Sequence, residues 1–346
     1  MPKLKAGGAE KILIWLYKNL MTNGFKITIC VLGSNSKNHF SVNNMNIVYL
    51  NKERLRTAFF EIYRLIKQQQ PCIVFTSIYH LNIFSGFLKI FFKKTNFIAR
   101  EANIYSERKK ISNKSMMPKF LEKYFYKKLD CIIFLSKEMK VDFENFFGCK
   151  FKSSIINNPI TTKHKLISKS ISPDNKINFL NVGSLHEKKG HSRLISKFSF
   201  LNLDYSLKIY GEGNLKNELN LKIKKLNLVE KIKLMGLFKD LNSIYKNSNF
   251  FIQSSFVEGF PNALLEALYF GIPCLVLKAP GGHNEIIKDG FNGFIINEKD
   301  NFVEEIERLI SHNWDRKAIK ENVINRYSPE KTLSQYEKIF KNFLDK

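Results

Sequence analysis

Two glutamates eight residues apart, Glu258 and Glu266, lie in a segment whose residue types could bind hydroxyl groups and phosphate. Glu258 falls in a predicted loop after a strand, and Glu266 lies about one turn into a helix predicted to begin near Pro261. A carboxylate accepts hydrogen bonds from vicinal hydroxyls, so Glu266 could hold a ribose and Glu258 a sugar beyond it. The N–H groups of Asn262 and Ala263 at the helix start suit a diphosphate. For either glutamate alone, a solvated position on a capped amphipathic helix is the simpler interpretation.

Other segments carry glycine-rich or charged turns where strands are predicted to end. They are 7–10 (GGAE), 181–190 (NVGSLHEKKG), 209–213 (IYGEG), 279–287 (APGGHNEII) and 289–293 (DGFNG). With 254–268 (SSFVEGFPNALLEAL), they resemble in order the motifs of the family 4 retaining glycosyltransferases of group 1 type, which have the GT-B fold. The spacing of Glu258 and Glu266 is similar to the E-x7-E signature of that family. The resemblance covers most of residues 177–300 and is weak before them.

The resemblance implies a role for each matching residue. Glu258 would contact the donor sugar and support the reaction at its anomeric carbon, and Glu266 would hold the ribose. Lys189 would stabilise the leaving nucleoside diphosphate, which makes Glu258 and Lys189 the implied catalytic residues. The region of Gly236 would lie beside the base. The implied donor-binding residues are Gly8, Ser184, Gly213, Gly236, Phe260, Pro261, Asn262, Ala263 and Glu266.

The sequence departs from the family pattern in both halves. The family often has an arginine where this chain has Ser184, so one cation of the diphosphate site is missing, and Lys188 is a candidate substitute. Members also often place a histidine near the reacting centre after a strand in the first domain, and the corresponding segment, 98–103, has none. Glu101 and Asn103 are therefore the candidates for acceptor contacts, although an ordinary strand end explains them equally well.

Nothing in the sequence indicates a metal or cofactor site. It has no D-x-D pair, and its seven histidines form neither an H-x-x-x-H nor an H-E-x-x-H pattern. A Walker A sequence and a nucleophilic serine elbow are also missing. His186 and His191 flank Lys189, and surface positions are the favoured interpretation of both. We expect a metal-independent reaction in which the nucleotide sugar is a co-substrate and no cofactor takes part.

The elements that must position these residues follow an alternating pattern of strands and helices, which predicts parallel sheets covered on both faces. The expected fold class is α/β, and the resemblance implies GT-B, with two Rossmann-like domains facing a cleft. We expect an acceptor-binding domain at 1–165, a donor-binding domain at 166–328, and a C-terminal helix at 329–346 that returns to the first domain. A breaker at 157–159 and a polar segment up to 176 define the boundary. The predicted strands are 26–32, 72–76, 96–100, 131–135, 154–157, 177–182, 206–210, 231–235, 249–253, 273–277 and 293–296.

The start of the chain is unusual for this family. The GG pair at 7–8 leads into a predicted helix at 9–23, whereas such a turn normally follows a strand that aims it at the ligand. No residues remain to form that first strand, and losing a central strand is costly. A truncated chain, or a start set at an internal methionine, is therefore our hypothesis. A native mass without upstream residues, in a stable domain, would contradict it.

The first half is strongly basic. Residues 1–165 carry 29 Lys and Arg against 10 Asp and Glu, a net charge of +19, whereas 166–346 carry 27 against 21, a net charge of +6. Such a field attracts nucleic acid, anionic membranes or anionic substrates. Aromatic residues mix with lysines in 84–94 and 119–128, which is a composition of interfacial membrane contacts. A helix that faces the core and exposes its lysines explains each stretch equally well.

The expected location is cytoplasmic, peripheral on the inner face of the plasma membrane. The N-terminus lacks the apolar region of a signal peptide, and no apolar run approaches the ~20 residues that a membrane span requires. The expected partners are a nucleotide-sugar donor, a glycan or lipid-linked acceptor, and an anionic membrane surface. Nucleic acid is disfavoured as a partner, because the charge is spread through aromatic-rich helices rather than placed on a reading module.

We interpret the chain as a hexosyltransferase that moves a hexose or N-acetylhexosamine from a nucleotide diphosphate, with UDP as the commonest donor, to a lipid-linked or surface-glycan acceptor with retention. Three alternatives stay open. A nucleotide-sugar epimerase of the same fold would need its own acid and base near the sugar. A basic nucleic-acid- or membrane-binding non-enzyme would show salt-dependent binding. An inactive remnant is motivated by Ser184 and by the missing first strand.

Overall fold

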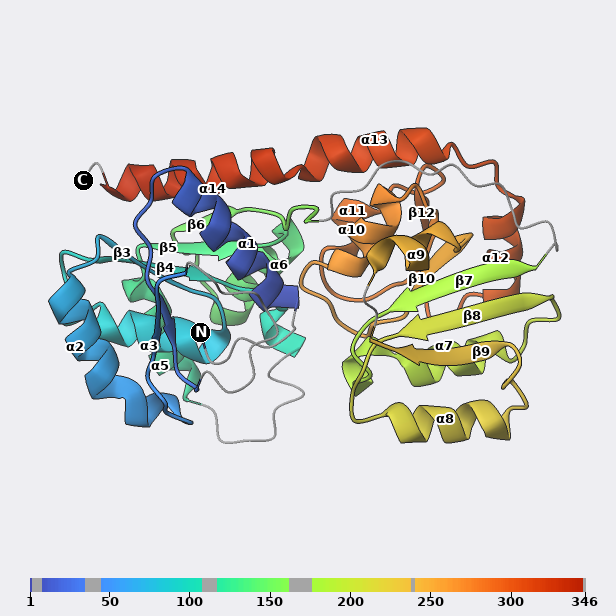
Figure 1. The fold of residues 1–346 in the computed structure, drawn as a ribbon, viewed down its shortest axis with the longest axis horizontal. Helices are drawn as coiled ribbons and strands as arrows, with labels where there is room; N and C mark the ends of the chain where they lie inside the picture. The colour runs from blue at the N-terminus through green and yellow to red at the C-terminus, as the bar shows by residue number, and fades with distance from the viewer. Residues whose placement is uncertain (2–7, 35–44, 108–116, 162–175, 238–239, 345–346) are drawn as a thin grey trace. The chain divides into compact units, whose positions relative to one another are not determined.

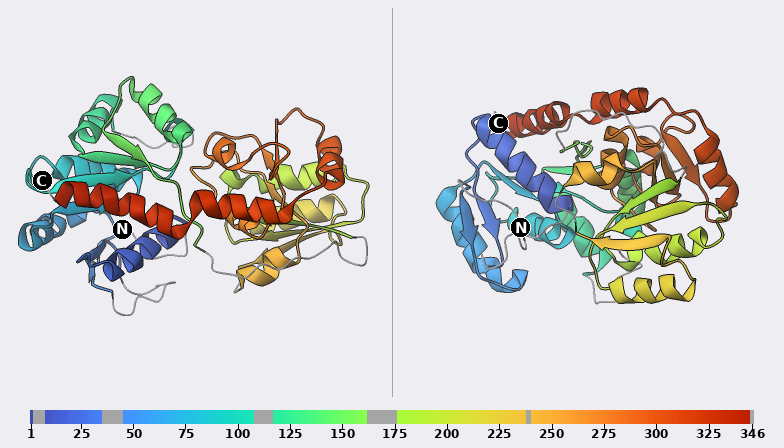
Figure 2. Two further views of the ribbon diagram at one scale, coloured as in Figure 1. Left: turned by 90° about the horizontal axis from the view of Figure 1, so that it is seen from above. Right: turned by 45° about the vertical axis from the view of Figure 1, so that its right-hand side comes forward.

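The computed structural model describes residues 1, 8–34, 45–107, 117–161, 176–237 and 240–344. The chain divides into two compact units, one formed by Met1–Thr161 together with Pro329–Lys346, the other by Thr162–Ser328. Each unit combines helices with strands that pair in parallel (Figures 1 and 2). The predicted α/β class with two parallel-sheet domains is therefore confirmed. The boundary expected at residue 165 falls outside the described residues.

The second unit contains a six-stranded parallel sheet with the order β12-β11-β10-β7-β8-β9. Helices cover both of its faces, with α7 and α8 on one side and α10 and α11 on the other (Figure 1). The strands are β7 (Ile177–Val182), β8 (Tyr205–Tyr210), β9 (Ile232–Gly236), β10 (Phe250–Gln253), β11 (Cys274–Leu277) and β12 (Gly293–Ile296). The helices are η2 (Glu187–Lys189), α7 (His191–Phe198), α8 (Lys216–Lys225), α9 (Leu241–Lys246), α10 (Asn262–Tyr269), α11 (His283–Ile286), α12 (Phe302–Ser311) and α13 (Arg316–Tyr327).

Neighbouring strands β10 and β11 are buried along their whole length. Their sequences, FFIQ and CLVL, are continuous rather than alternating in apolar character, as strands covered by helices on both faces require. Strand β8, which lies next to the edge strand β9, alternates between buried and half-buried residues instead. Because all six strands are parallel, the loops that follow them at their carboxyl ends leave one edge of the sheet, where ligands bind in open α/β folds.

The first unit contains a four-stranded parallel sheet, ordered β3-β4-β5-β6, and a separate two-stranded parallel sheet of β1 and β2. Met1 lies beside β1, because its carbonyl accepts a hydrogen bond from the amide of Leu32 at 2.9 Å. Within the described residues, no strand precedes α1. The strands are β1 (Ile29–Val31), β2 (Ile47–Tyr49), β3 (Ile73–Thr76), β4 (Asn96–Arg100), β5 (Cys131–Phe134) and β6 (Ser153–Ile155). The helices are α1 (Gly8–Thr22), η1 (Leu55–Ala58), α2 (Phe59–Gln69), α3 (Tyr79–Leu88), α5 (Lys119–Lys128) and α6 (Lys137–Phe147).

The last helix, α14 (Pro329–Leu344), packs into the first unit. Its residues Tyr336 and Phe340 lie in one buried cluster with Leu16 of α1 and Ile98 of β4. The first unit is thus completed by residues from the far end of the chain.

All eleven predicted strands are present, with bounds that differ by at most three residues. The short strand β2 was not predicted, because three apolar residues beside polar ones give little pattern. Pro261 is the N-cap of α10 rather than its first residue, since its ψ of 105° is extended. None of the described helices has the length and apolar character needed to cross a membrane.

Candidate functional site

Three loops at the carboxyl edge of the six-stranded sheet contact one another through their backbones. The loop after β10 meets the loop after β7, where the amide of Phe256 donates to the carbonyl of Lys188 at 2.8 Å. It also meets the loop after β11, where the amide of Glu258 donates to the carbonyl of Pro280 at 3.1 Å. Motifs that are about a hundred residues apart in the sequence therefore form one site.

Two glycines permit this close contact. Gly190 has a φ of 66°, and a Cβ atom there would lie 2.0 Å from the carbonyl oxygen of Ser254. Gly281 has a φ of 132°, and a Cβ atom there would lie 1.7 Å from the carbonyl oxygen of Glu258. Any side chain at either position would push the loops apart, in addition to the strain of a positive φ.

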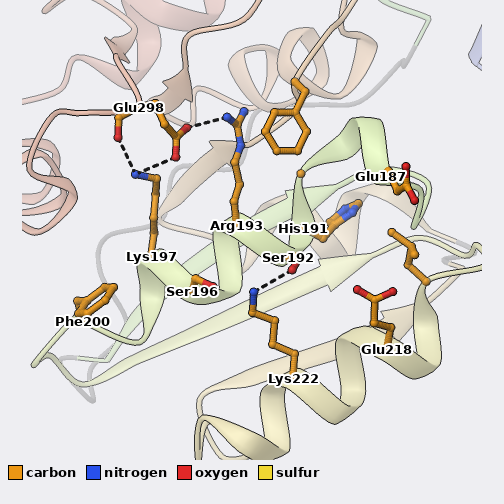
Figure 3. Close-up of a pocket in the computed structure, with 13 residues that line it drawn as sticks. Glu187, His191, Ser192, Arg193, Ser196, Lys197, Phe200, Glu218, Lys222 and Glu298 are labelled. Carbon is orange, nitrogen blue, oxygen red and sulfur yellow. Dashed lines mark hydrogen bonds and ion pairs between the residues drawn. The ribbon is translucent and has the colours of Figure 1, made fainter. Parts of the chain in front are cut away.

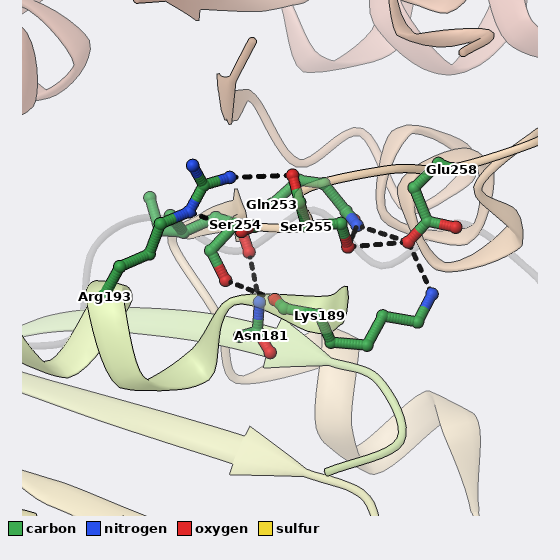
Figure 4. Close-up of polar contacts among 8 residues, drawn as sticks. Asn181, Lys189, Arg193, Gln253, Ser254, Ser255 and Glu258 are labelled. Atoms are coloured by element: carbon green, nitrogen blue, oxygen red, sulfur yellow. Dashed lines mark hydrogen bonds and ion pairs between the residues drawn. The ribbon is translucent and has the colours of Figure 1, made fainter. Parts of the chain in front are cut away.

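The structure brings the two predicted catalytic residues, Lys189 and Glu258, into direct contact (Figure 4). The ammonium group of Lys189 donates to Oε1 of Glu258, whose side chain is 11% exposed. Burial raises the pKa of Glu258, but the charge of Lys189 and the hydrogen bonds from Lys189 and Ser255 outweigh burial, so the pKa lies below its ordinary value. Glu258 is therefore a carboxylate at neutral pH, suited to accept hydrogen bonds rather than to donate a proton.

Two residues that the sequence analysis did not predict also bind Oε1 of Glu258. The side-chain amide of Gln253 donates to it at 3.0 Å, and the hydroxyl of Ser255 donates at 2.6 Å. Among the described residues, Oε2 of Glu258 has no hydrogen-bond partner. A sequence signal for Gln253 exists, because it is the single polar residue of the otherwise apolar β10 and stands at its carboxyl end.

Arg193 fixes the backbone of the loop that carries Glu258. Its Nε donates to the carbonyl of Ser254 at 2.8 Å, and one terminal nitrogen donates to that of Ser255 at 2.7 Å. The guanidinium also lies 4.0 Å from the ring centroid of Phe256. The loop is thus held from α7, the helix that follows Lys189.

Glu266 lies one turn inside α10, as predicted from its spacing, and is buried. The hydroxyl of Tyr245, from α9, donates to Oε2 of Glu266 at 3.1 Å and to the carbonyl of Ala263 at 3.3 Å. Burial, followed by the charge of Glu266 and this hydrogen bond, raises the pKa of Tyr245 well above its ordinary value. Tyr245 therefore keeps its proton and orients the carboxylate.

The structure also places other predicted donor-binding residues of the second unit. Phe260 is buried against Tyr327, with ring centroids 5.5 Å apart, and Asn262 and Ala263 are the first two residues of α10. Gly213 lies against the loop after β7, because a Cβ atom there would be 2.2 Å from the carbonyl oxygen of Leu185.

The loops after β7, β8 and β9 also meet at this edge. Gly211 lies against the loop of Ser184, because a Cβ atom there would be 1.9 Å from the carbonyl oxygen of Gly183. Gly236, which has a φ of 73°, accepts a hydrogen bond from the amide of Gly211 at 2.9 Å. The loop of Ser184 and the end of β9 at Gly236 therefore share Gly211 as a neighbour.

The predicted site residues of the first unit differ in their exposure to solvent. Glu101 is buried, and its Oε1 accepts hydrogen bonds from Asn82 at 2.6 Å and from the hydroxyl of Tyr126 at 2.5 Å. Asn103 is exposed, and Gly8 is the exposed first residue of α1. The preceding glycine of the GG pair lies outside the described residues. Protein donors thus engage Oε1 of Glu101, a residue expected to contact the acceptor.

The surface interpretation of His191 is wrong, because its side chain is 1% exposed. Within the described residues, neither ring nitrogen of His191 has a hydrogen-bond partner. Burial and the nearby charge of Lys189 lower its pKa to about 4, so the ring is neutral at physiological pH. Burial also lowers the pKa of His283, and the charge of Glu258 partly offsets this effect. In the described ranges, no group of three or more His, Cys, Asp or Glu side chains could hold a metal ion.

A separate pocket of about 470 Å³ opens between α7 and α8 (Figure 3). Three of its charged side chains bind one another: Glu298 accepts from Arg193 at 2.7 Å and lies 3.4 Å from the ammonium group of Lys197. Lys222 donates to the hydroxyl of Ser192 at 2.8 Å. The described lining includes neither Glu258 nor Glu266, so this pocket is distinct from the predicted donor site.

Family models match both units of the chain. The model for group 1 glycosyl transferases matches residues 162–326, and the model for glycosyltransferase family 4 matches residues 6–164. The first match contains Lys189, Glu258 and Glu266.

Individual proteins are similar over most of the chain. An uncharacterized glycosyltransferase of Methanocaldococcus jannaschii is 31% identical over 254 residues, which cover 66% of this chain and 61% of that protein. The N-acetylgalactosamine-N,N'-diacetylbacillosaminyl-diphospho-undecaprenol 4-alpha-N-acetylgalactosaminyltransferase of Campylobacter jejuni is 27% identical over 341 residues, which cover 93% and 92%. The Anabaena protein HepE, solved in complex with UDP-glucose, has a TM-score of 0.80 at 15% identity and covers 99% of this chain and 98% of its own. That last likeness shows a shared fold.

Proposed function

The chain belongs to the group 1, family 4 glycosyltransferases, whose two models together match residues 6–326, and on that premise we propose the reaction that it catalyses. It transfers a hexose or N-acetylhexosamine from a nucleotide diphosphate, UDP in our proposal, to a lipid-linked or surface-glycan acceptor with retention at the anomeric carbon. The observation that carries this proposal is the contact between Lys189 and Glu258 at the carboxyl end of β10.

The proposed donor site uses the residues gathered at this edge. Glu258 accepts hydrogen bonds from hydroxyls of the sugar, and Glu266 accepts them from the ribose. The N-terminus of α10, with Asn262 and Ala263, and the cation of Lys189 bind the diphosphate. As the sugar leaves, negative charge grows on the diphosphate, and Lys189 stabilises it in place of a divalent metal ion. The UDP-glucose complex of Anabaena HepE, which has a similar fold, supports UDP as the donor nucleotide.

The proposed acceptor is a lipid-linked glycan. Support comes from the Campylobacter relative, whose name places its acceptor sugar on diphospho-undecaprenol and which matches this chain over nearly its whole length. Such an acceptor lies at a membrane, so the enzyme must work at a lipid surface. We propose a peripheral association with the inner face of the plasma membrane.

An exposed aromatic surface of the first unit supports this association. Phe60 of α2, Phe91 after α3 and Tyr124 of α5 are 71%, 50% and 47% exposed, and we call them the aromatic ridge. Ring contacts through three further residues join them: Phe59, Phe87 and Phe125. Exposed lysines that lie within four residues of Phe91 or Tyr124 in the sequence are Lys93, Lys94, Lys127 and Lys128. Aromatic rings flanked by cations suit the boundary between anionic headgroups and acyl chains.

The proposed function is tested first by thermal unfolding in the presence of UDP, GDP, ADP and their sugar derivatives. A ligand at a hundredfold its dissociation constant stabilises the folded state by roughly 2.7 kcal/mol. We expect UDP and one UDP-sugar to stabilise the wild type, with a smaller effect on Glu266→Ala and an unchanged effect on Glu218→Ala, whose carboxylate is exposed and lies on α8. No stabilisation by any nucleotide, in a cooperatively folded sample, would refute the proposal.

A further inference from the structure

We infer that Gln253 and Ser255 are positioning residues of the donor-sugar site: together they hold Oε1 of Glu258 and thereby present Oε2 to the donor sugar. The inference rests on the proposed function, because it assigns the sugar to Glu258. Neither residue contacts the sugar in this arrangement. Both act through the carboxylate.

The three side chains form a closed triangle of hydrogen bonds (Figure 4). The amide nitrogen of Gln253 donates to Oε1 of Glu258 at 3.0 Å and to the hydroxyl oxygen of Ser255 at 2.8 Å. The hydroxyl of Ser255 in turn donates to the same Oε1 at 2.6 Å. The opposite orientation of the amide would set its oxygen against the carboxylate, so the hydrogen-bond network determines which way Gln253 faces.

Gln253 is placed on a rigid part of the unit. It is the last residue of β10, which pairs with β7 on one side and β11 on the other, and its side chain is 3% exposed. A group held by packing in the middle of a sheet orients its partner better than one on a mobile loop. Glu258, which stands in a loop, therefore gains its orientation from the strand.

The arrangement divides the carboxylate into a bound and an available oxygen. Oε1 accepts from Lys189, Gln253 and Ser255, and a carboxylate offers only about four acceptor positions over both oxygens. Oε2 has no partner among the described residues and is the oxygen left for the vicinal hydroxyls of a sugar.

The neutral donors Gln253 and Ser255 also explain how Glu258 can stay oriented while Lys189 binds the diphosphate. Lys189 is the charged group that contacts Glu258 among the described residues, and Lys188 and the buried His283 of α11 also interact with it electrostatically. When the ammonium group of Lys189 turns toward the diphosphate, Gln253 and Ser255 still fix Oε1. One lysine can then act on the leaving group without releasing the sugar-binding carboxylate.

The test compares the dissociation constants of UDP and of UDP-glucose, UDP-galactose, UDP-GlcNAc and UDP-GalNAc. The ratio of the constant for UDP to that for the preferred UDP-sugar measures what the sugar adds. We expect Gln253→Met, which keeps the size but removes the amide, to lower this ratio about tenfold while the constant for UDP stays within about twofold. Ser255→Ala should act in the same direction. The matched control is Asn249→Leu, which removes a buried amide next to the opposite end of β10 and should leave both constants unchanged.

A second variant separates positioning from a merely structural role. Gln253→Glu sets a new carboxylate against Oε1, where two like charges cannot both ionise without repulsion. At about pH 5.5 the pair can share one proton and restore the hydrogen bond, and at about pH 8 it cannot. The sugar contribution of this variant should therefore fall as the pH rises, whereas that of the wild type stays constant.

The outcomes distinguish the two hypotheses. Failure of the wild type to bind UDP or any UDP-sugar refutes the proposed function. Binding of UDP with no gain from any sugar, or equal sugar contributions in the wild type and Gln253→Met without a pH effect in Gln253→Glu, overturns the inference alone.

Discussion

The hydroxyl of Tyr245 and Oε2 of Glu266 lie 3.1 Å apart and share a hydrogen bond, although the two residues come from different helices, α9 and α10. The ring of Tyr245 stacks on Phe270, with centroids 5.0 Å apart and planes 7° apart, so the hydroxyl has little freedom. The carboxylate of Glu266 is the group proposed to hold the ribose, and Tyr245 contributes to its orientation.

Tyr245→Phe should weaken the binding of UDP by about fivefold, since the loss of one orienting hydrogen bond costs about 1 kcal/mol of binding free energy. Titration calorimetry with UDP measures the change. The matched control is Tyr205→Phe, which removes another buried hydroxyl of the same unit, bonded to the carbonyl of Phe198 at 2.8 Å. Both variants should lose stability, but only Tyr245→Phe should lose affinity. Equal affinities in both variants would contradict an orienting role.

His191 should make the second unit less stable in acid. Its folded pKa of about 4 lies below the ordinary value near 6.5, so the unfolded chain binds the proton more readily between these values. The stability that the neutral His191 contributes is therefore fully present above about pH 6.5 and is lost as the pH falls toward 4. This loss lowers the free energy of unfolding by about 3 kcal/mol. His191→Leu should unfold with less pH dependence, and His186→Asn, a change at an exposed histidine, should behave as the wild type. Chemical denaturation between pH 4 and 8 measures these slopes, and identical slopes in wild type and His191→Leu would contradict the assignment.

The aromatic ridge should be needed for membrane binding. Wild-type protein should sediment with vesicles that contain phosphatidylglycerol and not with pure phosphatidylcholine, and binding should weaken as salt screens the lysines. Replacing Phe60 and Phe91 by serine should lower the partition coefficient at least about tenfold, because two buried rings are lost. Phe200→Ser is the matched control, since Phe200 is 74% exposed in the second unit. Equal loss in the control, or no binding by the wild type, would contradict the proposed surface.

Tyr336→Ala should destabilise the first unit by about 3–5 kcal/mol, because it removes a large buried ring from the cluster shared with Leu16 and Ile98. The binding of UDP should persist, since every proposed nucleotide contact with a carboxylate or lysine lies in the second unit. Calorimetry with and without UDP resolves the two effects. Tyr124→Ala, at an exposed tyrosine of the same unit, should be nearly neutral, and a loss of UDP binding in Tyr336→Ala would show that the units do not fold independently.

Sequence pattern predicted most of the fold, for a physical reason. Strands covered on both faces need continuous apolar runs, and β10 and β11 have them, so their positions are clear. Lys189 and Glu258 were expected in one site from motif resemblance, and they contact each other. Their direct pairing was not foreseen, because spacing along the chain does not say which way a side chain turns.

The residues that the sequence analysis missed show the limits of prediction from local sequence pattern. His191, Leu194, Ile195 and Phe198 share the buried face of α7, and this helical spacing could have indicated that His191 is buried. The interpretation instead followed residue type, since histidine is often exposed. Ser255 had no such signal, because its role depends on a triangle that closes only when the loop folds back on β10.

The place of α14 has a consequence for biosynthesis. The ribosome makes β1 to β6 before Thr162–Ser328, but the helix that completes their core is made only after that whole segment. At ~5–20 residues per second, the first unit waits on the order of ten seconds with an uncovered apolar face. The second unit, contiguous in the chain, can fold in the meantime. The first unit can thus complete its core only after the second unit has been synthesised.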